Sequence, residues 1–338
     1  MLHEPIAHPD LARGGPVQRW DDLSFSIILP VYNRAHSIGA ALTSLLAQTR
    51  PAEEIIVVDD GSTDDLEAAL APYRAHVRLI RQANAGVAAA RNAGAAAARG
   101  GWLTFQDSDD LWTRDHLATV VRDLTHAPGD TVAHLGDVTY TGDGYVEQLF
   151  AIKNRTFPQD HAERIADPLP LVISGMTLQG AAVRRDVFAR LEGFDAGMRM
   201  LSDTAFFCQL ALEGPFAVTG HTLAEIRRLP GDAEAITSLH RKNAVYARQM
   251  HVRGLAALAA RRLPSGQQKL ADRALSGAEF RLAQALHGRD PRAARALLWQ
   301  AARRHPSPLK GWIKSQIAAI MGAPGYRWAL SDSSLDRS

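Results

Sequence analysis

The sequence predicts an α/β fold, in which a mostly parallel, Rossmann-like sheet carries helices on both faces and a helical extension follows at the C-terminal end. Three observations predict it. Short apolar runs alternate with segments of helical spacing four times between residues 25 and 110. Polar residues follow directly after three of these runs. Beyond about residue 240 the chain is rich in Ala, Arg and Leu, as is typical of helices.

The first half of the chain supplies the parallel strands. In chain order we expect strands at residues 25–29, 55–58, 77–80 and 102–105, with helices between them at 38–46, 63–73 and 87–99. Each strand is a short apolar run, as in a sheet that is covered on both faces. Parallel strands need helical crossovers, and ligands bind beyond the carboxyl ends of such strands.

After residue 125 the alternation gives way to other elements. In order we expect strands at 132–140 and 145–152 with a turn at 142–144, a polar loop at 155–170, a strand at 178–183, helices at 185–191 and 203–212, and helices from about 240 with breaks at Pro264, Pro291 and Pro306. The hairpin interrupts the parallel order of the sheet.

Composition describes an ordinary globular protein and excludes several classes. Hydrophobic residues make up 46% and charged residues 22% of the 338 positions, enough to bury a sizeable core. No run approaches the roughly 18–20 apolar residues of a membrane-spanning helix. Residues 1–23 contain no export signal and are expected to form a flexible polar arm. The single cysteine, Cys208, excludes a disulfide framework and predicts a buried thiol in a reducing, cytoplasmic compartment.

Charge divides the chain into an acidic body and a basic tail. Residues 241–338 hold 18 Lys and Arg but 5 Asp and Glu, although the whole chain has a net charge of +2. Two interpretations stay open: a helical cap with a solvated Arg face, or a peripheral contact with the inner face of the plasma membrane. The membrane contact would use Trp299, Trp312, Ile313, Ile317, Ile320 and Trp328. Nucleic-acid binding is not expected, because no stacking platform or recognition motif accompanies the charge.

An acidic cluster follows the fourth predicted strand. It consists of Asp107, Ser108, Asp109 and Asp110. Crowded carboxylates raise one another's pKa unless a cation neutralises them, and their oxygens suit Mg²⁺ or Mn²⁺. The other interpretation is a solvated acidic turn that caps a helix. A position at the ligand-binding edge of the sheet favours the metal site.

Two further groups lie near the same edge. Asp59 and Asp60 end the second strand, where a carboxylate either binds a ribose or base or only caps a turn. Gly86 precedes the Ala-rich helix and permits close backbone approach to a ligand. Arg91 lies inside that helix, where it could bind a phosphate, pair with an active-site carboxylate or lie on the surface.

Taken together, these blocks resemble the family 2 glycosyltransferases of the GT-A fold. The blocks are Pro30-Val31-Tyr32-Asn33, then Ile56 to Ser62, then Asn84-Ala85-Gly86 with Ala90 to Gly94, then Asp107 to Asp110. The resemblance covers about residues 24–228. It implies an inverting enzyme of bacterial surface polysaccharide or glycoconjugate synthesis. Such an enzyme uses a nucleotide-diphospho-sugar, here most simply a UDP-sugar, with a divalent metal and a saccharide or lipid-linked acceptor.

The resemblance also assigns domains and residue roles. It implies a catalytic domain at 24–238, with a nucleotide-binding half at 24–125 and an acceptor half at 126–238, and a basic helical region at 239–338. The nucleotide would be bordered by Pro30, Tyr32, Asn33, Asp59, Asp60, Gly86, Arg91, Asp107 and Ser108. Asp60 would hydrogen-bond to the base, and Asp109 would bind the metal directly. Asp107 would contact the ribose or serve as a possible second metal ligand, and Asp110 would be a structural residue or one that contacts the metal ligands.

The second half of the chain departs from the family pattern in places. The family carries an acidic pair before an apolar helix, and here Ser202 replaces the first member. Asp203 is therefore the sole candidate for the general base, and its alternative role is a helix cap. Asp195 is expected to close a turn. The segment at 227–231 resembles a basic segment near the diphosphate but lacks the usual His, and the Gln-x-x-Arg-Trp sequence of processive synthases is missing, so a single addition is expected.

Two other classes of protein are alternatives to a glycosyltransferase. An NAD-dependent oxidoreductase requires a Gly-x-Gly-x-x-Gly turn after the first strand, and Pro30-Val31-Tyr32-Asn33 stands there instead. A non-catalytic nucleotide-sugar-binding protein of the same fold would keep Asp60 and Asp109 but would not need Asp203. The second class stays open as the alternative function.

Overall fold

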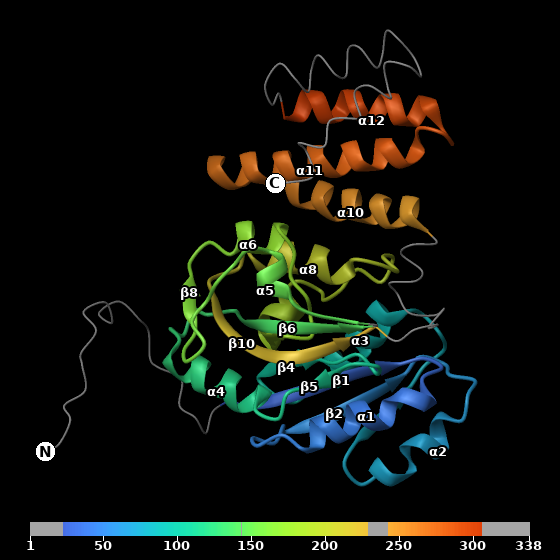
Figure 1. Ribbon diagram of the computed structural model, residues 1–338, viewed down its shortest axis with the longest axis vertical. Helices are drawn as coiled ribbons and strands as arrows, with labels where there is room; N and C mark the ends of the chain where they lie inside the picture. The colour runs from blue at the N-terminus through green and yellow to red at the C-terminus, as the bar shows by residue number, and fades with distance from the viewer. Residues whose placement is uncertain (1–22, 143, 229–242, 306–338) are drawn as a thin grey trace, which may run out of the picture. The chain divides into compact units, whose positions relative to one another are not determined.

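The computed structural model describes residues 23–142, 144–228 and 243–305, which form two compact units (Figure 1). One unit contains the described residues up to 197 together with 209–228, and the other contains 198–208 together with 243–305. The predicted N-terminal arm, except for the buried Leu23, and the predicted boundary at 238–239 lie outside the described residues.

The first unit begins with strands and helices in alternation. They are β1 (Phe25–Val31), α1 (Ala35–Leu46), β2 (Glu54–Asp59), α2 (Leu66–Leu70), the 3-10 helix η2 (Ala71–Tyr73), β3 (Arg78–Arg81), α3 (Val87–Ala97) and β4 (Trp102–Phe105). The rest of this unit is β5 (Leu111–Trp112), α4 (His116–His126), β6 (Ala133–Gly142), β7 (Tyr145–Gln148), α5 (Leu149–Ile152), β8 (Glu163–Ile165), α6 (Leu169–Ile173), β9 (Ala181–Arg184), α7 (Arg185–Arg190) and β10 (Phe216–Arg227).

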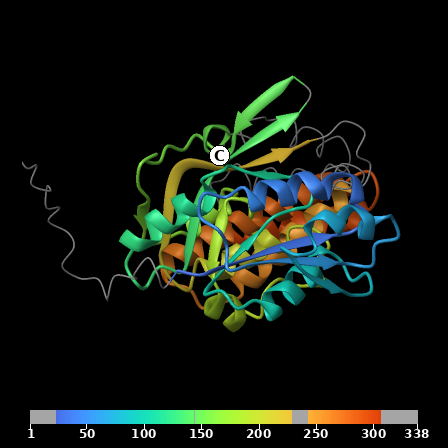
Figure 2. The same cartoon turned by 90° about the horizontal axis from the view of Figure 1, so that it is seen from below.

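These strands form a single mixed sheet surrounded by helices, which confirms the predicted fold class. The strand order is β3-β2-β1-β4-β9-β6-β10-β5, with β7 beside β6 and β8 beside β10. The first four strands are parallel, as the alternation predicts. Strand β9 runs antiparallel to both β4 and β6. Figure 2 shows the green β6–β7 hairpin standing out from the edge of the sheet.

Tight packing of α3 on the sheet sets the geometry of the predicted site. All seven residues of β1 are buried, as expected for a strand covered on both faces. A Cβ atom at Gly94 of α3 would lie 2.5 Å from Cγ2 of Ile28 and 3.1 Å from Cγ2 of Val58. The absence of a side chain at Gly94 therefore lets the helix backbone lie directly on β1 and β2.

Two predicted elements differ in type or length. The helix expected at 63–73 shortens to α2 and η2, because Oδ1 of Asn33 accepts a hydrogen bond from the backbone N of Thr63 and holds that residue outside the helix. The strand expected at 145–152 ends at Gln148, and α5 follows it. Both Leu149 and Phe150 are buried there, and a short apolar run does not distinguish strand from helix.

Several further elements were not expected from the sequence, namely the strands β5, β8 and β10 and the helices α4 and α6. The polar loop predicted at 155–170 contains β8, which pairs with β10 in the register Phe216↔Ile165, and the start of α6. The prediction of an unstructured loop was therefore wrong at 163–165. Strand β10, twelve residues long, was missed because a register shift around Gly220 interrupts its alternation.

The second unit is helical and contains Asp203. It consists of most of α8 (Ser202–Leu210), α10 (Ala244–Ala259), α11 (Ser265–Leu286) and α12 (Pro291–Arg304). A Cβ atom at Gly254 of α10 would lie 3.0 Å from Cβ of Ala205, so α8 and α10 pack closely. Cys208 is buried, as predicted, and burial raises the pKa of its thiol to about 12.

The basic tail forms helices that break at Pro264 and Pro291, as predicted. Ala283 and Leu298 lie in a core cluster between α11 and α12. Of the residues proposed for a membrane contact, Trp299 lies in α12 and the others are outside the described residues. None of the described helices combines the length and apolar character needed to cross a bilayer.

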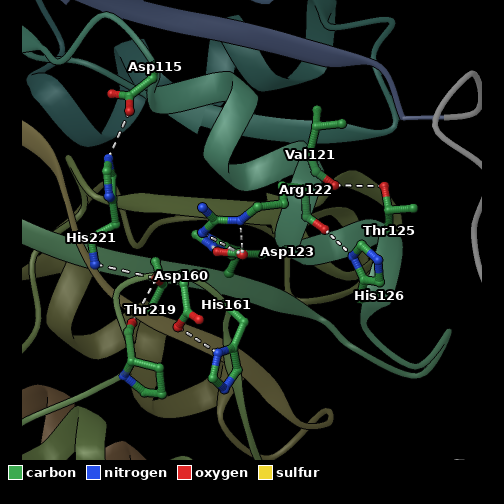
Figure 3. A network of polar contacts seen from close by, with 12 residues as sticks. Asp115, Val121, Arg122, Asp123, Thr125, His126, Asp160, His161, Thr219 and His221 are labelled. Carbon is green, nitrogen blue, oxygen red and sulfur yellow. Dashed lines mark hydrogen bonds and ion pairs between the residues drawn. The ribbon is translucent and has the colours of Figure 1, made fainter. Parts of the chain in front are cut away.

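A network of polar contacts joins α4 and its N-terminal end to the sheet (Figure 3). Nε2 of His221 lies 2.9 Å from Oδ2 of Asp115, and Nε of Arg122 donates to Oδ1 of Asp123 over 2.9 Å. Oδ2 of Asp123 lies 2.9 Å from Nε2 of the buried His134. Burial alone would raise the pKa of Asp123, but the hydrogen bonds with His134 and Arg122 outweigh it and lower that pKa. We interpret this network as structural.

Candidate functional site

The carboxyl ends of β1, β2 and β4 meet at one edge of the sheet. The register pairs Val31 with Asp59 and Ile28 with Phe105. The residues that follow these strands therefore lie along the same edge, where ligands bind in open parallel sheets. The residues that the sequence predicts to bind the nucleotide and the metal were expected at this edge.

Asp60 holds the loop that leads into α3. Its side chain is 3% exposed. Oδ1 accepts hydrogen bonds from Nε2 of Gln82 at 2.8 Å and from the backbone N of Ala85 at 2.9 Å, and Oδ2 accepts one from the backbone N of Gly86 at 2.8 Å. Gly86 has φ of +92°, which glycine adopts without strain. The structure thus brings Asp60 and Gly86 together.

Asp59 and Asn33 join the loops after β1 and β2. Oδ1 of Asp59 accepts from the backbone N of Ser62 at 2.8 Å, and its Oδ2 lies 3.7 Å from Nε of Arg81. Oδ1 of Asn33 accepts from the backbone N of Thr63 at 2.8 Å, and its own backbone N donates to Oγ of Ser62. These bonds fix the two loops that flank the predicted base pocket.

The two residues predicted to line the base differ in exposure. Pro30 is buried inside β1, in register with Val58. Tyr32 is 43% exposed. An exposed aromatic ring beyond a strand end offers a face on which a nucleobase can stack, so Tyr32 is the better placed of the two.

Asp107 receives hydrogen bonds on both carboxylate oxygens. Nη2 of Arg91 donates to Oδ1 over 2.5 Å, and Nε2 of Gln179 donates to Oδ2 over 2.6 Å. Arg91 is 5% exposed, so the surface alternative for this residue is wrong. Its guanidinium also lies over the ring of Phe194, 5.8 Å from the centroid. Of the alternatives left open for Arg91, the structure shows a pair with an acidic-cluster carboxylate.

Asp109 and Asp110 have contrasting environments. The Asp109 side chain is 24% exposed, and its Oδ2 lies 4.0 Å from Nε of Arg34. Asp110 is 3% exposed and accepts a hydrogen bond from the backbone N of Arg227 at 3.0 Å. Burial, followed by the charges of Asp107 and Asp109, raises the pKa of Asp110 well above its usual range. Of the two carboxylates, Asp109 is therefore the one that a ligand can reach, and the role of Asp110 stays a prediction.

The acidic cluster fits a hard divalent cation. Among the described residues, no three His, Cys, Asp or Glu side chains converge into a complete metal cage. Mg²⁺ and similar ions are commonly held by one or two carboxylates together with substrate phosphates. Asp109 and Asp107 can supply those oxygens, whereas Ser108, 6% exposed, and Asp110 are buried.

The basic segment that begins at the last residue of β10 supports the cluster. Nε of Arg227 donates to the backbone O of Asp109 over 2.9 Å, and its backbone N binds Asp110. The guanidinium of Arg228 lies 4.7 Å from the ring centroid of Tyr140. Residues 229–231 of this segment lie outside the described residues.

Asp203 is the second residue of α8 and belongs to the second compact unit. Its Oδ1 accepts a hydrogen bond from the backbone N of Thr204 at 2.8 Å. Its assignment as the general base stays a prediction. Asp195 closes a turn as expected, because its Oδ1 accepts from the backbone N of Gly197 at 2.8 Å.

Several supporting residues were missed by sequence reasoning. They are Arg34, Gln82 and Gln179, which contact Asp109, Asp60 and Asp107. Asn92, which lies in the block Ala90 to Gly94, forms hydrogen bonds with both the backbone N and the backbone O of Phe194. No sequence signal marks these residues, because their partners lie on other strands and loops.

Gly180 governs how closely β9 approaches β6 beside this site. A Cβ atom at Gly180 would lie 2.7 Å from the backbone O of Gly136. We expect Gly180→Ala to lower the free energy of unfolding by about 1–3 kcal/mol, the usual cost of overpacking. Urea denaturation measures the loss. Gly101→Ala is the control, since its new Cβ would meet nothing closer than 3.7 Å; equal stability of the two variants would contradict the prediction.

The fold and site together define an α/β protein with a carboxylate-lined edge on a mostly parallel part of its sheet, the place where ligands bind in open sheets of this kind. The family model of glycosyl transferase family 2 matches residues 26–191. This segment, about half of the chain, therefore resembles the catalytic domains of that family.

Curated relatives match part of this chain. An uncharacterized glycosyltransferase of Haemophilus influenzae is 31% identical over 194 residues, 56% of this chain and 63% of the relative. One of Rickettsia conorii is 40% identical over 110 residues, 32% of this chain and 18% of the relative. The Escherichia coli UDP-Glc:alpha-D-GlcNAc-diphosphoundecaprenol beta-1,3-glucosyltransferase WfgD is 37% identical over 99 residues, 29% of this chain and 39% of the relative. The chain thus spans less than two thirds of each relative's length.

Solved structures share the fold. S. aureus TarS in complex with UDP-GlcNAc has a TM-score of 0.68 at 18% identity, covering 91% of this chain and 90% of that chain. The mannosyltransferase from Pyrobaculum calidifontis in complex with GDP-Man and Mn²⁺ has a TM-score of 0.56 at 20% identity, covering 95% and 86%. At this level of identity the likeness establishes the GT-A fold.

Proposed function

We propose that this protein is an inverting, metal-dependent glycosyltransferase that moves a sugar from a nucleotide-diphospho-sugar to an acceptor hydroxyl. The observation that carries the proposal is the acidic cluster at 107–110, held at the same sheet edge as Asp60 and Tyr32. The match of residues 26–191 to the family model and the sugar-nucleotide complexes of the two structural neighbours support it. Two carboxylate regions, at the ends of β2 and β4 on either side of β1, suit the two ends of such a donor, its nucleoside and its diphosphate.

The reaction we infer is a single displacement. The acceptor oxygen forms a bond to the anomeric carbon while the bond from that carbon to the diphosphate breaks, so the configuration inverts. A divalent cation bound by Asp109, with Asp107 as a second ligand, would supply charge neutralisation for the departing diphosphate. Asp203 would accept the acceptor's hydroxyl proton. Positive charge on the anomeric carbon develops as in glycoside hydrolysis.

Within this proposal, the nucleoside half of the donor lies against Tyr32 and the loops held by Asp59, Asp60 and Asn33. The loop bonds of Asp60 and Asn33 order these segments before the ligand binds, which reduces the entropy cost of binding. A UDP-sugar is the donor we propose, in line with the UDP-GlcNAc in the TarS complex.

The acceptor we propose is a saccharide or a lipid-linked saccharide of bacterial surface polysaccharide or glycoconjugate synthesis. The name of the E. coli relative WfgD describes such a lipid-linked acceptor. Helix α12 carries Arg292, Arg295, Arg303 and Arg304 with no acidic residue. This charge supports a peripheral contact at the inner face of the plasma membrane, and loss of liposome binding after deletion of residues 241–338 would test it.

Asp109→Ala should remove most of the Mn²⁺-dependent stabilisation by a UDP-sugar. A ligand at about 100 times its Kd stabilises the folded state by about 2.7 kcal/mol, and thermal-shift screens with Mn²⁺ or with a chelator measure this gain. Asp130→Ala is the matched control, because Asp130 is exposed and pairs with Arg164 on the surface. An unchanged, metal-dependent shift in Asp109→Ala would remove the metal assignment.

The alternative function is non-catalytic binding of the same nucleotide sugars. The family is described as one of transferases, which are enzymes. Binding of a nucleotide sugar without catalysis would need only the residues of the donor site. Release of UDP from a UDP-sugar in the presence of acceptor separates the two: an enzyme releases UDP with turnover, whereas a binding protein does not.

A further inference from the structure

Gln179 lies opposite Asp107 because of the strand register. Strands β4 and β9 pair antiparallel as Trp102↔Arg184, Leu103↔Val183 and Thr104↔Ala182. Continued past the ends of both strands, this register places residue 179 across from Asp107. The close approach of Gly180 to the backbone O of Gly136 keeps the start of β9 in that position.

The amide of Gln179 has a defined orientation. Its Nε2 donates to Oδ2 of Asp107 over 2.6 Å. Its Oε1 accepts a hydrogen bond from the hydroxyl of Thr177. Because Thr177 occupies the acceptor end, the donor end faces the carboxylate. The Gln179 side chain is 8% exposed, so water competes little for this bond.

Together with Arg91, Gln179 fixes the plane of the Asp107 carboxylate. Arg91 reaches Oδ1 from helix α3, and Gln179 reaches Oδ2 from the segment before β9. A carboxylate has about four lone-pair positions, so the two bonds leave oxygen lone pairs available to a ligand. Asp107 is 25% exposed at its side chain, so a ligand can reach those positions.

We propose that Gln179 is a positioning residue for donor binding: it orients Asp107, through which it acts on the ribose or the metal of the bound donor. This inference rests on the proposed function. It assigns a role in the donor site to a residue of the predicted acceptor half. Gln179 also ties that half to the strand that carries the acidic cluster, so the donor site is complete only when β9 is paired with β4.

Two substitutions of Gln179 distinguish a role in positioning Asp107 from a role in packing alone. Gln179→Glu keeps the shape of the side chain but places an acceptor against Asp107, whereas Gln179→Leu removes the donor and leaves an apolar group. Binding of UDP in the presence of Mn²⁺ is measured by calorimetry at about pH 8, where carboxyl groups are ionised. We expect UDP affinity to fall about 10-fold in Gln179→Leu, since a hydrogen bond to a charged group is lost, and further in Gln179→Glu.

The order of the two variants decides the outcome. A residue that only fills space would tolerate the isosteric Glu better than Leu, so an affinity of Gln179→Glu equal to that of the wild type overturns the proposal. Gln148→Glu is the matched control, because Gln148 is exposed and donates to a hydroxyl, Oγ1 of Thr222. Thermal unfolding of each variant checks that the fold is retained.

A double-mutant cycle tests whether Gln179 acts through Asp107. In an Asp107→Asn background, Gln179→Leu should change UDP affinity by about 2-fold or less, since the shared interaction is already lost. A full 10-fold loss in that background would show that Gln179 acts independently of Asp107. Absence of UDP and UDP-sugar binding in the wild type would instead count against the proposed function.

Discussion

Asp203→Asn should lower the kcat of sugar transfer by about 10²–10⁴-fold, the usual contribution of a general base. An amide cannot accept the proton of the attacking hydroxyl, whereas donor binding does not use this group. The donor KM is therefore expected to stay nearly unchanged, which marks an interaction made only in the transition state. Steady-state kinetics with the donor and acceptor identified by screening measure both constants.

Asp195→Asn is the control for this variant. It makes the same chemical change eight residues earlier in the chain, at a carboxylate that closes a turn by accepting from the backbone N of Gly197. Asn retains an acceptor oxygen for that bond, so activity should persist. Full transfer activity in Asp203→Asn would remove the assignment of the base and would leave nucleotide-sugar binding as the better supported function.

Arg91→Met should lower the free energy of unfolding by about 3 kcal/mol, the lower end of the cost of breaking a buried ion pair. The guanidinium is 6% exposed, whereas its partner Asp107 is 25% exposed, so water can recover part of the loss. Met keeps most of the apolar contact with Phe194. Urea denaturation measures the stability, and donor KM should rise in the same variant because Asp107 loses one of its two hydrogen bonds.

Arg164→Met provides the matched comparison. Arg164 pairs with Asp130 at 2.9 Å, but both side chains lie largely in solvent, at 44% and 57% exposure. Exposed pairs contribute about 0–1 kcal/mol. A loss of similar size in both variants would mean that burial does not distinguish the Arg91–Asp107 pair and would contradict its role as an internal support of the site.

Much of the donor half of the site could be predicted from the sequence. Buried runs such as Ile55 to Val58 define the strands, and parallel strands bring their carboxyl ends to one edge. Asp59, Asp60 and the acidic cluster follow those ends directly. Their common location therefore depends on local pattern and on the handedness of crossovers, both of which can be read from sequence.

The contacts of these residues could not be predicted in the same way. Arg91 was compatible with a phosphate, a carboxylate or the surface until its burial and its bond to Asp107 were known. Asp60 was expected to bond to a base, and the structure shows both of its oxygens holding the 82–86 loop. Such assignments depend on side-chain directions across segments that are distant in sequence.

By itself the sequence determined the α/β class, the edge of the sheet that carries the acidic residues and the helical nature of the C-terminal region. Tertiary structure alone decided the strand β10, the helix α5 and the place of Gln179 opposite Asp107, 72 residues away in sequence. The physical reason is that these features depend on different kinds of information, one local in the sequence and the other set by contacts between distant segments. Strand and helix periodicity are local, whereas antiparallel register between β4 and β9 depends on which strands pair and on how closely Gly180 lets them approach.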